Sequence, residues 1–305
     1  GRKWRKAITT FMLSVPYRLL CSATPAPNDH MELGGSSEAL GVMTSSQMLS
    51  MFFTNDGETT QQWRLKGHAK RRFWQWVSGW ARAVRKPSDL GFSDEKFILP
   101  ELKIERHVLP SPVNGGFFAE PARTLTAQRK ERNRTVEKRC RKVAEIAPKD
   151  RPFLIWCHLN RESEELARMI EGAVNVRGSD PIDVKEERLT AFSTGEIRGL
   201  ITKSRIAGFG LNFQHCSHMA YFPSYSHEAY YQAIRRCWRF GQERPVVCHI
   251  ISTEAERMVV ESMLHKERQS VELYDGIVAE MGRKSSANTG VDDCESMKTP
   301  LWMRS

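Results

Sequence analysis

Short apolar runs alternate with helix-like segments through the second half of the chain. Between these runs apolar residues recur at helical spacing, and a long helical pattern follows the last of them. Such alternation is typical of βαβ units, in which parallel strands lie side by side and helices cover the sheet. The expected strands are 153–159, 174–176, 199–202, 219–222 and 246–251, and the expected helices are 161–170, 184–192, the segment from 228 onward, and 254–281. We therefore predict an α/β fold with a parallel sheet and flanking helices.

The first hundred residues follow a less regular pattern. A helical pattern extends to Ser14, and the apolar run YRLLCS at 17–22 predicts a short buried strand that leads into a tight loop. Residues 29–53 are helical in pattern and rich in methionine, with a break expected at Gly34-Gly35. This part of the chain is therefore expected to be mainly helical.

A further helix with an aromatic face is predicted for residues 68–85. Its large apolar side chains fall on one stripe at helical spacing, namely Phe73, Trp76, Val77, Trp80 and Val84. One interpretation is a basic and aromatic surface that binds nucleic acid. Because the stripe is so regular, we favour tryptophans buried in a core, with the arginines facing water.

The pattern changes again near residue 100. The segment ELKIERHVLP at 101–110 alternates like a strand, with prolines on both sides. We place a domain boundary here, which divides the chain into residues 1–105, 106–282 and 283–305. A charged helix at 117–147 is expected to open the second domain. The last segment is rich in Ser, Asn, Gly and Asp, so we expect a disordered tail.

Composition narrows the class of protein. Lysine and arginine number 46 against 36 acidic residues, which gives a net charge of +10. This excess suits a polyanionic partner, although a basic surface without such a partner is an alternative. Apolar runs stay below the roughly 18 residues of a membrane span, and the N-terminus GRKWRKAITT has no signal-peptide core. We therefore expect a soluble intracellular protein with no membrane association.

The cysteines predict neither disulfides nor a metal site. There are 7 cysteines, and no two stand in a Cys-x-x-Cys pair. Reduced thiols fit this pattern better than a disulfide framework or a zinc ribbon. The run from His215 to His218 holds two imidazoles and a thiol, but no second pair stands at ligand spacing. No metal ligands are therefore expected.

Three arginines crowd the stretch EAYYQAIRRCWRFGQERP at 228–245. A helix turns about 100° per residue, so Arg236 and Arg239 are expected on one face while Arg235 points elsewhere. Two guanidinium groups with the same direction need an anion. A carboxylate, a nucleic-acid phosphate and the γ-phosphate of a nucleotide are the alternatives.

Four segments, in this order and spacing, resemble motifs of one family. They are LLCSATPAPN at 19–28, WCHLNRESEEL at 156–166, AGFGLN at 207–212 and QAIRRCWRFGQ at 232–242. These are similar to motifs III, IV, V and VI of superfamily-two helicases of the SNF2-like group, in particular those of bacteriophages and prophages. The resemblance covers most of the chain. It implies the C-terminal two-thirds or so of a helicase motor.

The resemblance implies an ATP-dependent DNA helicase or translocase made of RecA-like lobes of the P-loop NTPase type. The chain would then hold one complete C-terminal lobe and the end of the N-terminal lobe. ATP and Mg²⁺ would be the cofactors, double-stranded DNA the partner, and the cytoplasm of a bacterial or phage-infected cell the location. The implied roles are arginine fingers at Arg236 and Arg239, nucleotide binding at Gly208, Gly210, Asn212 and Gln232, coupling at Ser22, Ala23 and Thr24, and DNA binding at Lys203, Ser204 and Arg205.

Two parts of such a motor have no counterpart in the sequence. No Gly-x-x-x-x-Gly-Lys-Ser/Thr loop is present, and Gly282-Arg283-Lys284-Ser285 lacks the Gly-Lys pair. The acidic box that binds Mg²⁺ is also missing, because Asp94-Glu95 comes after motif III rather than before it. We expect both parts in an N-terminal RecA-like half that precedes residue 1. The alternative is a non-catalytic DNA-binding remnant.

Overall fold

The computed structural model of the 305-residue chain describes residues 2–55, 63–111, 125–207 and 210–287. The chain divides into a first unit, residues 1–94 with 269–305, and a second unit, residues 95–268. The division falls at Glu95 rather than at 105/106, because the strand β3 (Leu102–Leu109) pairs with the last strand of the second unit. The end of the last helix also belongs with the first unit.

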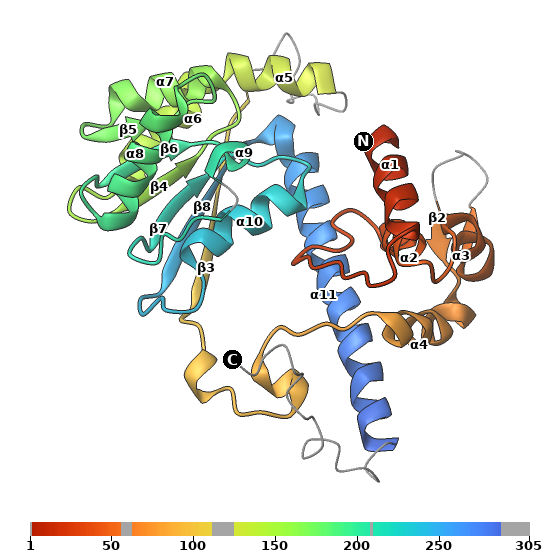
Figure 1. Ribbon diagram of the computed structural model, residues 1–305. Coiled ribbons are helices and arrows are strands. Elements are labelled where there is room, and N and C mark those ends of the chain that lie inside the picture. The colour runs from red at the N-terminus through yellow and green to blue at the C-terminus, as the bar shows by residue number, and fades with distance from the viewer. Residues whose placement is uncertain (1, 56–62, 112–124, 208–209, 288–305) are drawn as a thin grey trace. The chain divides into compact units, whose positions relative to one another are not determined.

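The second unit is built on a six-stranded sheet of order β3-β8-β7-β4-β6-β5 (Figure 1). All of its strand pairs are parallel, as the alternating pattern predicted. The remaining strands are β4 (Phe153–Trp156), β5 (Ala173–Asn175), β6 (Gly199–Thr202), β7 (His218–Tyr221) and β8 (Val246–Thr253). The predicted fold class, an α/β fold with a parallel sheet and flanking helices, is confirmed.

Helices cover both faces of this sheet. The helices of the second unit are α5 (Leu125–Arg134), α6 (Val136–Ile146), α7 (Asn160–Met169), α8 (Ile182–Thr194), α9 (Ser204–Ala207) and α10 (His227–Cys237), with 3₁₀ turns at Glu95–Phe97 and Glu254–Glu256. On one face α6 and α7 pack over β4 through Val143, Leu166 and Ile155. On the other face α8 and α10 pack through Phe192 and Ile234. The two apolar layers explain why β4 and β6 are buried throughout.

The single charged helix expected at 117–147 is in fact two helices. The α5 helix ends at Arg134 and α6 begins at Val136, with Thr135 between them in a non-helical conformation. The start of the expected helix, up to residue 124, lies outside the described residues. The Thr135 hydroxyl donates to the Glu131 carbonyl at 2.8 Å, so the break is stabilised by its own side chain.

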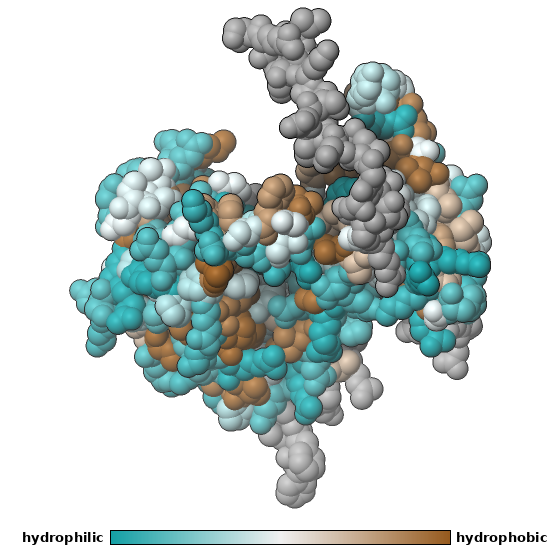
Figure 2. All heavy atoms as spheres, turned by 90° about the horizontal axis from the view of Figure 1, so that it is seen from below, coloured by the Kyte–Doolittle hydropathy of each residue, from teal (hydrophilic) through white to brown (hydrophobic). Residues whose placement is uncertain are grey.

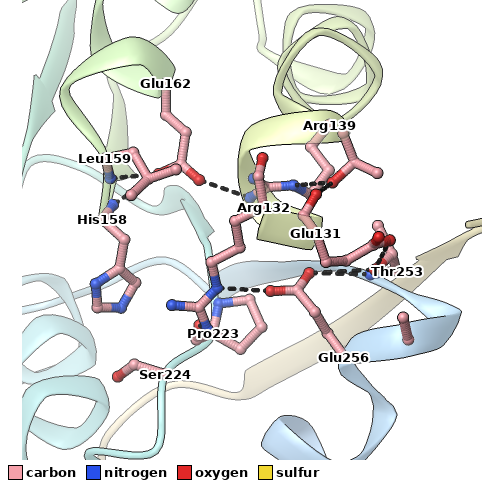
Figure 3. A network of polar contacts seen from close by, with 12 residues as sticks. Glu131, Arg132, Arg139, His158, Leu159, Glu162, Pro223, Ser224, Thr253 and Glu256 are labelled. Carbon is pink, nitrogen blue, oxygen red and sulfur yellow. Dashed lines mark hydrogen bonds and ion pairs between the residues drawn. The ribbon is translucent and has the colours of Figure 1, made fainter. Parts of the chain in front are cut away.

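A buried ion pair fixes α6 against α7 (Figure 3). Arg139 Nη1 donates to Glu162 Oε1 at 2.7 Å, and the two side chains are 1% and 0% exposed. The other oxygen of Glu162 accepts from the backbone N–H groups of His158 and Leu159, both at 2.8 Å. Glu162 therefore caps the start of its own helix while it neutralises Arg139, so this buried carboxylate has a partner at each oxygen.

A second pair ties α5 to the carboxyl end of the sheet. Arg132 Nε donates to Glu256 Oε1 at 2.7 Å, and its Nη2 donates to the Pro223 carbonyl at 2.8 Å. Pro223 follows β7 and Glu256 follows β8. This polar network, shown in Figure 3, therefore joins α5 to the residues that follow two neighbouring strands.

The first unit is mainly helical. Its elements are α1 (Arg2–Leu13), α2 (Leu33–Leu40), α3 (Ser45–Phe52), the antiparallel pair β1 (Phe53–Asn55) and β2 (Trp63–Leu65), α4 (Lys70–Trp80), and 3₁₀ turns at His30–Glu32, Gly67–Ala69 and Pro87–Leu90. The final helix α11 (Arg257–Ala287) begins in the second unit and ends in the first. Gly276 of α11 meets the ring of Trp74, where a Cβ atom would lie 2.6 Å from a ring carbon. Only glycine allows this close approach.

The aromatic stripe on α4 forms a core, as favoured above. Phe73 and Val77 are fully buried, and Trp74 joins them although the stripe did not include it. Val84 is exposed, because α4 ends at Trp80 and the helical spacing no longer applies beyond that point. Packing of the tryptophans against one another, rather than against nucleic acid, therefore explains the pattern.

The strand expected at 17–22 does not form. The segment has no strand assignment, and Tyr17 and Leu19 are 92% and 82% exposed. A strand requires a hydrogen-bonded neighbour, and none of the described strands pairs with this segment. The apolar run therefore stays exposed.

The position of a helix break and the start of the expected tail also differ from the sequence prediction. Gly34 and Gly35 lie inside α2, and the break comes at Gly41, whose φ of 76° ends the helix in the left-handed conformation. At the other end of the chain, residues 283–287 continue α11 rather than forming a disordered tail, and 288–305 lie outside the described residues.

Hydrophilic side chains predominate on the face shown in Figure 2, with small hydrophobic groups among them. This agrees with the mean hydropathy of −0.49 for the whole chain. Among the described helices, none combines the length and the apolar composition needed to cross a membrane.

Candidate functional site

The arginine pair lies where α10 ends. The helix stops at Cys237, so Arg239 is in the turn that follows and does not share a helix face with Arg236 as expected. The two guanidinium groups nevertheless converge on one atom. Nη1 of Arg236 lies 2.9 Å from the Leu211 carbonyl oxygen, and Nη1 of Arg239 lies 3.5 Å from it. The turn after the helix therefore restores the convergence that helical spacing predicted.

Arg236 is held firmly by neutral acceptors. Its side chain donates through Nε to the Gln232 carbonyl at 3.2 Å and through Nη2 to the Gln232 side-chain oxygen at 2.8 Å. Arg236 is 8% exposed. Burial, and then the positive charge of Arg239, lower the pKa of this guanidinium from its usual value. The site therefore concentrates positive charge away from water.

Arg239 completes the pair. It donates through Nη1 to the side-chain oxygen of Asn212, while its Nε is buried without a hydrogen-bond partner among the described residues. In the part of the chain that the structure describes, no carboxylate forms an ion pair with either arginine. The acidic partner within the lobe, one of the alternatives left by the sequence, is not found there.

Arg235 points away from the pair, as predicted. Its guanidinium carbon lies 4.4 Å from the ring centre of Trp238 and 5.2 Å from that of Tyr231. Stacking on aromatic faces gives this arginine a structural partner. It is therefore a natural control for the other two.

The loop after α9 is shaped by main-chain contacts with α10. The Phe213 N–H donates to the Arg236 carbonyl at 2.8 Å. The buried side-chain amide of Gln242 donates to the carbonyls of Gln214 at 2.8 Å and Cys216 at 3.1 Å. Gly241, with φ of 89°, allows the chain to turn back toward Gln214. The sequence placed Gln242 and Leu211 in their motifs but did not predict that the backbone carbonyls of Leu211 and Gln214 act as acceptors, because backbone acceptors carry no sequence signal.

Of the glycines expected at the nucleotide, only one can be assessed. Gly210 has φ of 74°, and a Cβ atom there would meet no atom within 4 Å. The backbone at Gly210 is therefore open to a ligand. Gly208 lies outside the described residues.

The residues expected to bind DNA lie at the carboxyl end of β6. Lys203 Nζ donates to Asn160 Oδ1 at 2.5 Å, which joins the residue after β6 to the first residue of α7. Ser204 begins α9 and the side chain of Arg205 is exposed. The arginine pair lies where α10 ends, and α10 packs against α9, so the two predicted functions belong to neighbouring elements of the second unit.

The expected coupling residues belong to the first unit. Thr24 is buried and its N–H lies 3.0 Å from the Ser22 hydroxyl oxygen, while the Ala23 carbonyl accepts from the Tyr274 hydroxyl at 2.6 Å. They are well held by neighbours in that unit. They are not brought together with the arginine pair within either unit.

A comparison with known families covers the part of the chain that holds the arginine pair. Residues 137–241 match the family described as "Helicase conserved C-terminal domain". That range runs from α6 through the arginine pair. This part of the chain is similar to helicase C-terminal domains. Its parallel sheet with helices on both faces is the RecA-like lobe that the resemblance implied.

Two relatives with similar sequences are also described as helicases. The chain is 28% identical over 127 residues to the bifunctional helicase and thymine dioxygenase JBP2 of Leishmania braziliensis, which covers 41% of this chain. It is 29% identical over 122 residues to that of Leishmania infantum, which covers 39% of this chain. In each case the chain spans only 11% of the relative's length.

Two solved structures are similar to parts of this chain, with low TM-scores and low sequence identity. The C-terminal part of the Fun30 ATPase domain has a TM-score of 0.36 and 18% identity, with 50% of this chain and 54% of that chain covered. A DEAD box protein from the hyperthermophile Methanococcus jannaschii has a TM-score of 0.38 and 19% identity, with 56% and 40% covered.

Proposed function

We propose that this helicase C-terminal domain works in an ATP-dependent motor that moves on DNA, and that Arg236 and Arg239 act on the γ-phosphate of ATP. One observation carries the proposal: two guanidinium groups converge on the Leu211 carbonyl with no carboxylate partner among the described residues. Arg236 is buried and Arg239 is partly buried, and two neighbouring cations withdrawn from water are unfavourable unless an anion joins them. A nucleotide phosphate has the charge and the oxygen geometry to do so.

The proposed chemistry is the hydrolysis of ATP. Phosphoryl transfer to water spreads negative charge over the γ-phosphoryl oxygens, and arginines that stabilise this charge can raise the rate by about 10³–10⁵. Gln232 fixes Arg236 through two hydrogen bonds, and Asn212 fixes Arg239 through one. These residues are therefore proposed to position the arginines, rather than to bind the nucleotide directly as the sequence suggested.

The second half of the site is proposed to come from an N-terminal RecA-like half. The 305 residues hold no phosphate-binding loop motif and no acidic box ahead of motif III, so both would have to be supplied by that half, together with Mg²⁺. Ser22, Ala23 and Thr24 are proposed to couple its nucleotide state to the grip on DNA. The SNF2-like assignment rests on the order and spacing of the motifs.

DNA is proposed as the polymer along which the motor moves. The net charge of +10 favours a polyanion, and Lys203 and Arg205 stand at the carboxyl end of the sheet, where open α/β sheets bind ligands. A motor of this kind is expected to hold the sugar-phosphate backbone rather than read bases. The helicase description of the Leishmania relatives agrees with this proposal.

The deciding experiment is DNA-stimulated ATP hydrolysis by the complete motor, with Arg236 or Arg239 replaced by lysine. Loss of turnover with ATP binding retained would support the proposal. Normal turnover in both variants would overturn it and would leave the pair as structural arginines. A complete motor with no ATPase activity at all would favour the non-catalytic DNA-binding remnant.

A further inference from the structure

A cluster of ligand-type side chains lies on the edge of the sheet, away from the arginine pair. Glu105 and His107 alternate along β3 and point to the same face, and Glu105 stands opposite His249 in the register with β8. Their neighbours Ile104 and Cys248 point to the opposite face, into the core that α10 covers. The cluster therefore occupies the α6 side of the sheet and is independent of the proposed ATP site.

The three side chains place their ligand atoms close together. His107 Nε2 lies 3.0 Å from His249 Nδ1, and that nitrogen lies 3.3 Å from Glu105 Oε2. All three atoms fall within 4.8 Å of one another. Ligands bound to a tetrahedral Zn²⁺ at about 2.0–2.2 Å are separated by about 3.3–3.6 Å. The two distances that involve His249 lie within about 0.3 Å of that range, and the ligand atoms of His107 and Glu105 lie within 4.8 Å of each other.

A single proton on His249 Nδ1 cannot satisfy both of the atoms that face this nitrogen. His249 Nδ1 faces both an imidazole nitrogen and a carboxylate oxygen. A single N–H on it would have to be shared between two acceptors, whereas a cation at the centre would accept a lone pair from all three atoms. Two imidazoles and one carboxylate also form a known ligand set for zinc with an open fourth position.

A nearby lysine keeps the carboxylate in place. Lys103 Nζ lies 2.6 Å from Glu105 Oε1, which leaves Oε2 directed at His249. The lysine thus holds the carboxylate in the orientation that a metal ligand beside His249 requires.

We propose that Glu105, His107 and His249 bind one Zn²⁺ ion, with water as the fourth ligand. Glu105 is one-third exposed, so solvent reaches this side of the cluster. The ion would join the edge strand β3 to β8 by bonds between side chains. Because β3 has a neighbour on only one side, it gains most from such a link.

The test is zinc binding by the 305-residue chain after removal of metal with a chelator, measured by calorimetric titration and metal analysis. We expect one Zn²⁺ per chain. Glu105→Gln, His107→Gln and His249→Gln should each weaken binding by at least about tenfold. Zinc should also raise the melting temperature of the wild-type chain, because it binds the folded state. In the His107→Gln and His249→Gln variants this rise should be much smaller.

Two control variants separate this site from adventitious binding. His265→Gln removes an exposed histidine of the same unit, and Cys21→Ser removes an exposed thiol. Both should bind zinc like the wild type. A wild-type chain that binds no zinc would overturn the proposal even if the cluster variants failed to fold. Equal affinity in wild type and cluster variants would overturn it as well.

Discussion

Arg236 donates to the carbonyl of Leu211 at 2.9 Å, which connects the last turn of α10 to the loop after α9. Arg239 approaches the same oxygen from the turn beyond the helix. The loop and the turn thus share one acceptor, and neither arginine can move without disturbing it. Both guanidinium groups are therefore directed toward one place, which is the arrangement that the proposed action on a phosphate requires.

Replacement of Arg236 or Arg239 by lysine in the complete motor should lower kcat far more than it raises the KM for ATP. Lysine keeps the charge but loses the planar fork that holds two oxygens. We expect a loss in kcat of about 10³-fold or more, measured as DNA-stimulated phosphate release. Arg235→Lys is the matched control, because Arg235 stacks on Trp238 instead. A comparable loss in this control would show that the effect is structural.

Binding to double-stranded DNA should depend steeply on salt and little on sequence. Lys203→Ala and Arg205→Ala should each weaken binding and reduce the slope of log affinity against log salt by about one. Fluorescence anisotropy with two unrelated duplexes measures both quantities. Arg151→Ala is the control, since Arg151 precedes β4 at the amino end of the sheet whereas Lys203 follows β6 at the carboxyl end. An unchanged slope in all variants would place the DNA contacts elsewhere.

The Arg139–Glu162 pair should matter strongly for stability. Glu162→Gln keeps the shape of the side chain but leaves Arg139 buried without a counter-charge. The expected loss in free energy of unfolding is about 3–5 kcal/mol, measured by urea denaturation. Glu261→Gln breaks the exposed pair with Arg257 and should cost about 1 kcal/mol or less. Equal midpoints for the two variants would contradict the prediction.

Acid should destabilise the second unit partly through His227. Burial, and then the charge of Lys266, lower the pKa of His227 to about 4, and its Nδ1 is buried without a hydrogen-bond partner among the described residues. Above about pH 6.5 this histidine is neutral in both folded and unfolded chains. Between about pH 6.5 and pH 4 only the unfolded chain takes up the proton, so stability falls by about 1.4 kcal/mol per pH unit and falls no further below that window.

The measurement for His227 is the free energy of unfolding from pH 7 to pH 4 in wild type and His227→Leu. The variant should show a shallower fall, whatever its stability at pH 7. His158, whose pKa burial also lowers to about 4, is present in both chains and contributes equally to both curves. Parallel curves would mean that His227 does not carry the effect.

Local sequence was enough to predict much of the second unit. The runs GLIT and MAYF became β6 and β7 within one residue, because short apolar segments bounded by polar turns form buried strands in a parallel sheet. The direction of Arg235 away from Arg236 followed from the helical turn alone. Motif order likewise indicated the helicase C-terminal domain before any fold was known.

Tertiary structure decided what depends on distant partners. The apolar run at 17–22 reads as a strand but has none to pair with, so it stays exposed. The convergence of Arg239 and Arg236 depends on a carbonyl of Leu211, and backbone atoms are the same in every residue. Glu105 and His249 are 144 positions apart in sequence and meet only because β3 and β8 pair in one register. Sequence specifies local conformation through each residue's own neighbours, whereas a site made from separate segments exists only after the chain has folded.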